Sequence, residues 1–126
     1  MIKSVIKGYG YYVPENVVTN DDLSKLMTTN DEWITERTGI KERRHRKNRN
    51  DSEETTAFLA KKAAEKALEK ANLTAKDLDF IVFATLSPDY FFPGSGVVLQ
   101  EMLGCDTIGA LDVRNQCSGF VYSMSV

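Results

Sequence analysis

The sequence has few of the residues that mark specialised classes of protein. It holds two cysteines, one histidine and a net charge of −2 in 126 residues. Two cysteines make no disulfide framework and favour a reducing compartment, so we expect a cytoplasmic protein. The small net charge gives no general reason to expect nucleic-acid or membrane binding. No stretch approaches the ~20 apolar residues of a membrane span, and residues 1–7 lack the apolar core and cleavage site of a signal peptide.

What is present is the composition of a soluble globular protein, with 42% hydrophobic and 27% charged residues. In the second half, apolar runs alternate with helical patterns. Residues 79–85 predict a strand buried on both faces, and residues 94–103 predict a helix closed by Gly104. Residues 107–113 predict a second strand, and residues 120–126 a buried helix. This alternation indicates an α/β sheet with helices on its faces.

The first half predicts a strand at residues 2–6 that ends at Gly8 and Gly10. A capping box at residues 19–22 predicts a short helix through residue 27. The same signal at residues 29–32 predicts a second helix that ends at Gly39. Alanines at three- and four-residue steps predict a long helix over residues 51–72.

Residues 41–50 are the most charged stretch of the chain and include the only histidine, His45. A solvated loop is the ordinary interpretation of such a run. The alternative is a patch that attracts the phosphates of a coenzyme or an acidic protein. We interpret His45 as a surface residue with no catalytic role.

Cys117 follows the predicted strand directly and precedes the predicted last helix. The first N–H groups of a helix are unpaired and carry partial positive charge, which favours thiolate over thiol. The same donors can hold an oxyanion. A buried, inert cysteine is the alternative, and position alone leaves both interpretations open.

Four segments, taken together, resemble one protein family. They read GYGYYVP (8–14), NDEWITERTGIKER (30–43), ATLSPDYFFP (84–93) and DVRNQCSGF (112–120). The chain resembles the β-ketoacyl-acyl-carrier-protein synthase III family, the condensing enzymes that initiate type II fatty-acid synthesis. The resemblance covers essentially the whole chain, and it favours Cys117 as a nucleophile.

The resemblance implies an α/β fold, the N-terminal half of a thiolase-like fold, whose central, mostly parallel mixed sheet is covered by helices. Members of the family are more than twice as long, with two similar halves packed as a pseudo-dimer. We therefore expect residues 1–126 to be an N-terminal half that ends inside the nucleophile helix. Phe80 to Ala84 would then lack part of its cover, and self-association is expected.

The resemblance also implies the chemistry. Cys117 takes an acyl group from acetyl-coenzyme A, or another acyl-coenzyme A, and malonyl-acyl-carrier protein then condenses with it after losing carbon dioxide. The family supplies a histidine and an asparagine for the second step from its other half, so these 126 residues alone are not expected to complete it. No metal and no cofactor beyond the coenzyme A substrate are expected.

Three further residues match binding positions of the family. Trp33 and Arg37 lie four apart on one helix face, where they can sandwich the adenine of coenzyme A, with Thr29 nearby. Without the resemblance, Trp33 would be interpreted as a core residue. Phe92 matches the phenylalanine that lines the acyl pocket of the partner in a homodimer, and ordinary core packing is its alternative.

Two alternatives to this function stay open. Arg114, Asn115 and Gln116 stand where many members have small residues. A related enzyme that uses another starter acyl-coenzyme A, or passes the acyl group to another acceptor, would fit this departure. A fragment that serves only as a dimerising module is the non-enzymatic alternative.

Overall fold

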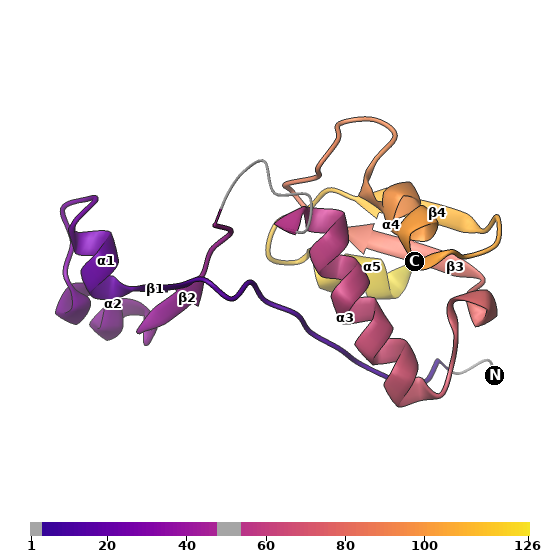
Figure 1. Cartoon of the computed structure of the whole chain (residues 1–126), viewed down its shortest axis with the longest axis horizontal. Coiled ribbons are helices and arrows are strands. Elements are labelled where there is room, and N and C mark those ends of the chain that lie inside the picture. Colours follow the sequence, from indigo (N-terminus) through magenta and orange to yellow (C-terminus); the bar gives the residue numbers. More distant parts are fainter. Residues whose placement is uncertain (1–3, 48–53) are drawn as a thin grey trace. The chain divides into compact units, whose positions relative to one another are not determined.

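The computed structural model describes residues 4–47 and 54–126, which divide into two compact units (Figure 1). One unit is Val13–Glu54. The other joins Met1–Tyr12 to Thr55–Val126. No helix of the described residues is both long enough and apolar enough for a bilayer crossing.

The larger unit is built around a strand–helix–strand motif. Strands β3 (Phe80–Ala84) and β4 (Gly109–Val113) pair in parallel, with Ile81 opposite Ala110. Helix α4 (Ser95–Leu103) connects them and packs against both strands. Parallel pairing requires such a crossover because the chain must return to the same edge before it runs forward again. The α/β organisation expected from the sequence is present, as a pair of strands.

The hydrophobic core lies on one face of this strand pair. Ile81, Phe83 and Leu99 are buried together, and Ile108 packs against them. On the other face, Phe80 is 53% exposed, and helix α5 (Gly119–Ser125) begins beside Ala84. The prediction that this strand is buried on both faces is therefore wrong, because α5 covers only the carboxyl end of its second face.

Helix α5 itself is not buried, contrary to the sequence-based expectation. Its large apolar side chains stand exposed, and no element of the described chain packs over its outer face. They are Phe120, Val121, Tyr122 and Met124. The prediction that this helix is buried is therefore wrong, because the described residues provide no surface that covers these side chains.

Helix α3 (Thr56–Ala71) packs against α4, and the fully buried Ala57 lies on it. Thr55 caps its first turn, so the helix begins later than the expected residue 51, which lies outside the described residues. A single 3-10 turn, η2 (Ala75–Asp77), leads from α3 to β3.

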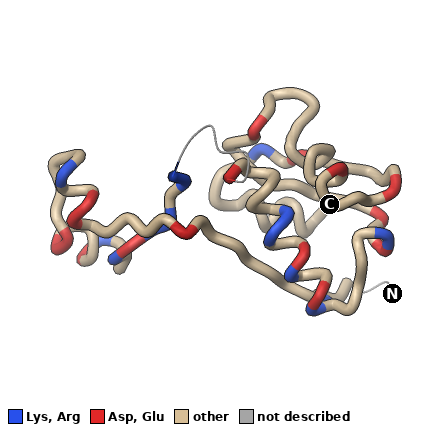
Figure 2. The backbone as a smooth tube through the Cα atoms, in the orientation of Figure 1, with Lys and Arg blue, Asp and Glu red and all other residues tan. Residues whose placement is uncertain are grey.

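The expected first strand is an extended segment without strand pairing over residues 4–10. The main chain at Gly8 and Gly10 lies so close to α3 that a β-carbon on either would collide with a carbonyl oxygen of the helix. Two lysines of α3 contact this stretch of the chain, and basic positions along the helix are blue in Figure 2. Lys66 donates to the Tyr11 carbonyl at 3.2 Å, and the Lys70 ammonium lies 3.9 Å from the Tyr9 ring centre. The segment packs against helix α3 and has no strand partner among the described residues, so its apolar pattern does not produce a strand.

The smaller unit contains an antiparallel pair and two short helices. Strand β1 (Val17–Thr19) pairs with β2 (Glu42–Arg44). Helix α1 (Asn20–Ser24) follows β1 directly, and α2 (Asp31–Thr38) ends at Gly39 in the left-handed conformation, as the sequence predicts. Helix α1 stops before the predicted residue 27, and β2 lies inside the stretch that was interpreted as a solvated loop.

Asn20 is the polar centre of this unit. Its side chain, 1% exposed, donates to Asp31 Oδ1 at 2.7 Å and to the Ile40 carbonyl at 2.8 Å. Arg43 donates to Asn20 Oδ1 at 2.6 Å. Every hydrogen-bonding group of the buried amide is therefore used, and one side chain joins α1 to α2 and β2.

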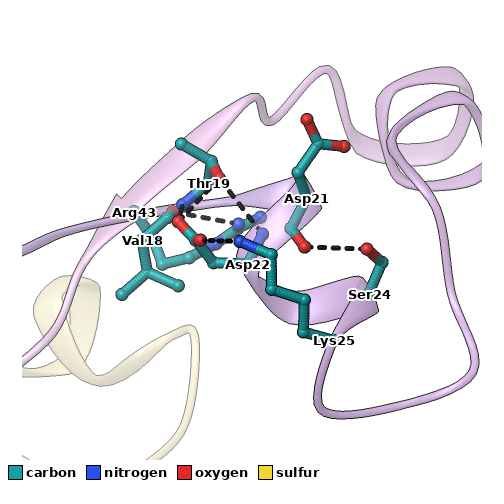
Figure 3. A network of polar contacts seen from close by, with 7 residues as sticks. All are labelled: Val18, Thr19, Asp21, Asp22, Ser24, Lys25 and Arg43. Carbon is teal, nitrogen blue, oxygen red and sulfur yellow. Dashed lines mark hydrogen bonds and ion pairs between the residues drawn. The ribbon is translucent and has the colours of Figure 1, made fainter.

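The capping box of α1 links its stability to pH. Thr19 and Asp22 bond reciprocally, and Lys25 lies 2.9 Å from Asp22 (Figure 3). The pKa of the Asp22 carboxyl is lowered well below its ordinary value by hydrogen bonds from Lys25 and then Thr19. A carboxyl with a lowered pKa in the folded state contributes stability above its ordinary pKa of about 4, and this contribution is lost as pH falls.

We therefore expect amide exchange in α1 to accelerate, relative to intrinsic rates, when the pH falls from 7 to 3. Asp22→Asn should raise the exchange at pH 7 and flatten the pH dependence. Asp21→Asn is the matched control, because the bond of Asp21 with Ser24 uses the main-chain oxygen. An Asp22→Asn protein with the parent's pH profile would contradict the capping role.

Candidate active site

Cys117 lies in the turn that joins β4 to α5. It is a free thiol, and the residue is exposed. The turn is closed by the Gly119 N–H, which donates to the Gln116 carbonyl at 2.9 Å, and α5 starts from the Ser118 carbonyl. Cys117 is therefore not a buried residue of this structure, and its role as a nucleophile stays a prediction. Cys105, in contrast, packs partly buried against the core, as expected of a structural cysteine.

A second loop, residues 85–94, leaves the carboxyl end of β3 next to the Cys117 turn. The two strands run in parallel, so the loops that follow them emerge at the same edge. The Thr85 N–H donates to the Val113 carbonyl at 3.2 Å, which extends the pairing to the base of both loops. A substrate that reaches Cys117 at this edge would meet residues of both loops.

Two carboxylates fix the ends of helices around this edge. Asp112 accepts from the N–H groups of Ser95 and Gly96, both at 2.7 Å, at the start of α4. Asp89 accepts from the N–H groups of Thr56 and Ala57, also at 2.7 Å, at the start of α3. Each satisfies donors that a helix leaves unpaired and places negative charge at its positive end.

Neither carboxylate was singled out from the sequence. The signal for Asp112 is a charged residue within an apolar strand, since such a residue is normally buried only with a partner. The matching signal is that Gly94, the N-cap residue of α4, has no side chain with which to cap the helix. Nothing local marks Asp89, because its partners lie more than 30 residues away in sequence.

Phe92 is 87% exposed, as is its neighbour Phe91. The alternative that Phe92 is an ordinary core residue is therefore wrong. Exposed aromatic residues that lie together often mark an interaction site, so the exposed pair favours contact with another surface. The assignment of Phe92 to an acyl pocket stays a prediction.

A separate pocket lies in the smaller unit. It has a volume of about 320 Å³ and is lined by Thr28, Thr29, Asn30 and Trp33. Asn30 caps α2 through the Trp33 N–H at 2.7 Å, which sets the ring at the start of the helix. The Thr29 hydroxyl is buried and has no hydrogen-bond partner among the described residues. Thr29 and Trp33, two of the residues predicted to bind coenzyme A, therefore line the same pocket. The polar group without a partner in this pocket is the hydroxyl of Thr29 itself.

Arg37 stacks on Trp33, with its guanidinium carbon 4.5 Å from the ring centre. The two side chains share one helix face, as their spacing predicts. Trp33 is 52% exposed, so its interpretation as a core residue is wrong. A planar base between the two needs two spacings of roughly 3.5 Å each, about 7 Å in all. Sandwiching a base therefore requires the exposed Arg37 side chain to swing outward.

The basic stretch divides into structural and exposed residues. Arg43 donates hydrogen bonds to Asn20 Oδ1 and to the Val18 carbonyl. Arg44 donates to the Glu15 carbonyl at 3.1 Å. His45 is exposed and pairs through its main chain with Asn16. Residues 48–50 of the stretch lie outside the described part. Among the described residues no group of His, Cys, Asp and Glu has a metal-binding arrangement.

Comparison with known proteins supplies the identity of the fold. No family model matches the chain. A β-ketoacyl-[acyl-carrier-protein] synthase III of Xanthomonas euvesicatoria is 49% identical over 125 residues, which is 99% of this chain and 37% of the relative. The crystal structure of 3-oxoacyl-[acyl-carrier-protein] synthase III from Aquifex aeolicus superimposes with a TM-score of 0.88 at 47% identity, over 95% of this chain and 37% of that one.

The chain is homologous to β-ketoacyl-[acyl-carrier-protein] synthase III. It spans a little over a third of the length of the synthase III relatives that it matches. The priming β-ketosynthase of the R1128 polyketide pathway has the same fold, with a TM-score of 0.87 at 30% identity over 95% of this chain and 35% of that one. The resemblance and the α/β fold class inferred from sequence motifs are therefore confirmed.

Proposed function

We propose that this protein is an acyltransferase of the synthase III type that initiates fatty-acid synthesis. Its substrates are acetyl-coenzyme A, or another acyl-coenzyme A, and malonyl-acyl-carrier protein. The observation that carries the proposal is the exposed Cys117 thiol at the carboxyl edge of two parallel strands, in a chain 45–49% identical to synthase III proteins. Two free cysteines also fit a reducing, cytoplasmic location.

Acylation of Cys117 is the first chemical step. The thiolate sulfur attacks the thioester carbonyl carbon, a new carbon–sulfur bond forms, and the bond to the coenzyme A sulfur breaks. The Cys117 N–H is the donor that we assign to the oxyanion of the intermediate. Cysteine suits this exchange because its thiolate is both a good nucleophile and a good leaving group.

Condensation is the second step. The malonyl thioester loses carbon dioxide, its carbanion attacks the acyl carbonyl on Cys117, and the cysteine thiolate leaves. The family resemblance assigns stabilisation of the enolate oxygen to a histidine and an asparagine outside these 126 residues. His45 takes no part in this proposal, because it is exposed and matches no family motif.

The test uses the protein as its gene encodes it, with acetyl-coenzyme A and malonyl-acyl-carrier protein. The expected product is acetoacetyl-carrier protein, formed with equal amounts of free coenzyme A and carbon dioxide. Mass spectrometry of the carrier protein measures it. Formation of neither that product nor any other β-ketoacyl-carrier protein, across a panel of acyl-coenzyme A thioesters, would contradict the proposal.

We assign the Thr28–Trp33 pocket to the adenine of coenzyme A. Trp33 offers an exposed ring, the Thr29 hydroxyl an unused polar group, and Arg37 a cation on the same helix face. Trp33→Ala should weaken acetyl-coenzyme A binding by about tenfold, the loss expected for one stacking and cation–π contact. Calorimetric titration measures it. Acetyl-pantetheine, which lacks adenine, is the control ligand, and an equal loss for both ligands would contradict the assignment.

We further propose a homodimer. The exposed rings of Phe91 and Phe92 and the uncovered apolar face of α5 support an association surface. A sedimentation profile of monomer alone at micromolar concentration would contradict it.

A related enzyme with another starter remains the second candidate. The specific observation is Arg114, which occupies the edge beside Cys117 and contacts the Phe91 segment. A priming β-ketosynthase of a polyketide pathway has the same fold at 30% identity, so the fold also serves an enzyme of another pathway. Comparing Cys117 acylation rates across acyl-coenzyme A thioesters separates the two candidates.

A further inference from the structure

Asp112 ties the end of β4 to the start of α4. It is the one charged residue of the two parallel strands, and it stands five positions before Cys117. Its two carboxylate oxygens accept from the N–H groups of Ser95 and Gly96, each at 2.7 Å. One side chain therefore joins the strand that leads into the Cys117 turn to the helix that packs beside it.

The start of α4 is shaped to this carboxylate. A β-carbon on Gly94 would collide with Asp112 Oδ2, and one on Gly96 would lie 2.6 Å from Oδ1. Gly94 also has a φ of 112°, which glycine adopts readily and other residues rarely do. The two glycines allow the helix to close on the carboxylate, and the positive end of the helix favours its charge.

Few other contacts hold the end of β4. On one side the Thr85 N–H donates to the Val113 carbonyl at 3.2 Å. Among the described residues β4 pairs with β3 alone, so no strand holds its other side. The exposed Arg114 side chain adds a contact with the neighbouring loop. The direction in which the turn leaves the sheet therefore depends on β3 and on the bonds of Asp112 with α4.

We propose that Asp112 is a positioning residue for acyl transfer, which holds the main chain of the turn where the Cys117 N–H reaches the thioester oxygen. The inference rests on the proposed function, which assigns that N–H to the oxyanion, and deepens it with a residue that acts through the turn. An oxyanion donor must lie about 2.7–3.1 Å from the oxygen. A displacement of about 1 Å can lower a rate by roughly a hundredfold.

Two reactions of the same thiol separate its position from its exposure. In acylation, the thiolate sulfur attacks the carbonyl carbon, an electron pair moves to the oxygen, and it returns as the coenzyme A thiolate leaves. In alkylation by iodoacetamide, the sulfur displaces iodide from carbon, and no oxyanion forms. A displaced turn therefore slows acylation alone, whereas a change in the thiol itself alters both reactions.

Asp112→Asn in the full protein tests the proposal. The amide keeps the shape of the side chain but offers one acceptor oxygen to two N–H donors. Acylation of Cys117 at saturating acetyl-coenzyme A, followed by mass spectrometry, should slow about tenfold, while KM and the iodoacetamide rate stay within about twofold. Hydrogen exchange of the amides at residues 114–119 should rise.

Two further variants accompany it. Asp77→Asn is the matched control, because it removes a carboxylate that accepts from the Thr74 N–H at 2.7 Å, before the other end of β3, and it should change neither rate. Gly96→Ala keeps the charge of Asp112 but places a methyl group 2.6 Å from Oδ1, so the carboxylate must shift. It should show the same selective loss of acylation, and it decides the question if Asp112→Asn does not fold.

The outcomes distinguish this inference from the proposed function. An unchanged acylation rate in the folded variants overturns the positioning role, and so do equal losses in acylation and alkylation. A loss of acylation that only follows the folded fraction, measured by thermal unfolding, assigns Asp112 to stability alone and also overturns it. If no thioester acylates the parent, the proposed function fails and this inference with it, whereas exchange at residues 114–119 still decides whether Asp112 holds the turn.

Discussion

Replacing Cys117 by alanine is expected to lower the rate of acyl transfer from acyl-coenzyme A by at least about 10³-fold. The substitution removes the group that we assign as the nucleophile, and loss of a nucleophile typically costs this much or more. The measurement is release of free coenzyme A over time. Because Cys117 is exposed, alanine there leaves no cavity, and the thermal unfolding midpoint should stay close to that of the parent.

Cys105→Ala is the matched control for that experiment. Cys105 packs against the core cluster, so its loss should lower stability moderately and leave most of the acyl transfer intact. The account fails if Cys117→Ala transfers acyl groups as fast as the parent, or if the Cys105 variant is the one that loses the reaction while still folded.

Replacing Asn20 by alanine is expected to destabilise the Val13–Glu54 unit by about 2–4 kcal/mol. The variant loses two donated bonds and the one accepted from Arg43, so Asp31, the Ile40 carbonyl and the Arg43 guanidinium each lose one hydrogen-bond partner. Asp31 opens α2, so the pocket beside Trp33 should loosen with it, and coenzyme A affinity should fall.

Hydrogen exchange of residues 17–44 measures the effect within that unit. Asn16→Ala is the matched control, because it makes the same substitution in the same unit. The bond between Asn16 and His45 uses the main-chain oxygen of Asn16, so this variant keeps it. A loss below about 0.5 kcal/mol for Asn20→Ala, the range of ordinary surface substitutions, would contradict the central role of the amide.

Local patterns predicted most of the elements of this fold. The capping box at residues 19–22, the glycine stops at Gly39 and Gly104, and the apolar runs of β3 and β4 lie within a few residues of the elements that they define. The second predicted capping box, at residues 29–32, is absent, because Asn30 alone caps α2. The helix predicted over residues 51–72 is α3, which spans Thr56–Ala71. Predictions of this kind succeed because a helix cap or a glycine stop depends only on residues close by in the sequence.

Features that depend on distant partners were missed. Asn20 was interpreted only as part of a capping box, yet its partners lie 11, 20 and 23 residues away. Burial of α5 was predicted from its apolar sequence, which says that a face seeks cover but not whether cover is present. The unpaired segment at residues 4–10 was misread for the same reason, because a strand needs a partner that periodicity does not reveal.

The candidate sites were predicted unevenly. Spacing alone placed Trp33 and Arg37 on one face, and the structure confirms their contact. Spacing did not indicate that the guanidinium would rest on the ring where a base is expected. The nucleophile assignment of Cys117 rests on the family resemblance, because a cysteine between a strand and a helix is also compatible with an inert role.

Locating the acyl group after incubation with a radiolabelled acyl-coenzyme A tests the central claim most directly. The protein is digested at a pH that preserves thioesters, and the peptides are separated and weighed. The account predicts label on the peptide that contains Cys117, released by hydroxylamine, with none on Cys105. Label confined to Cys105, or no thioester with any acyl-coenzyme A, would contradict it.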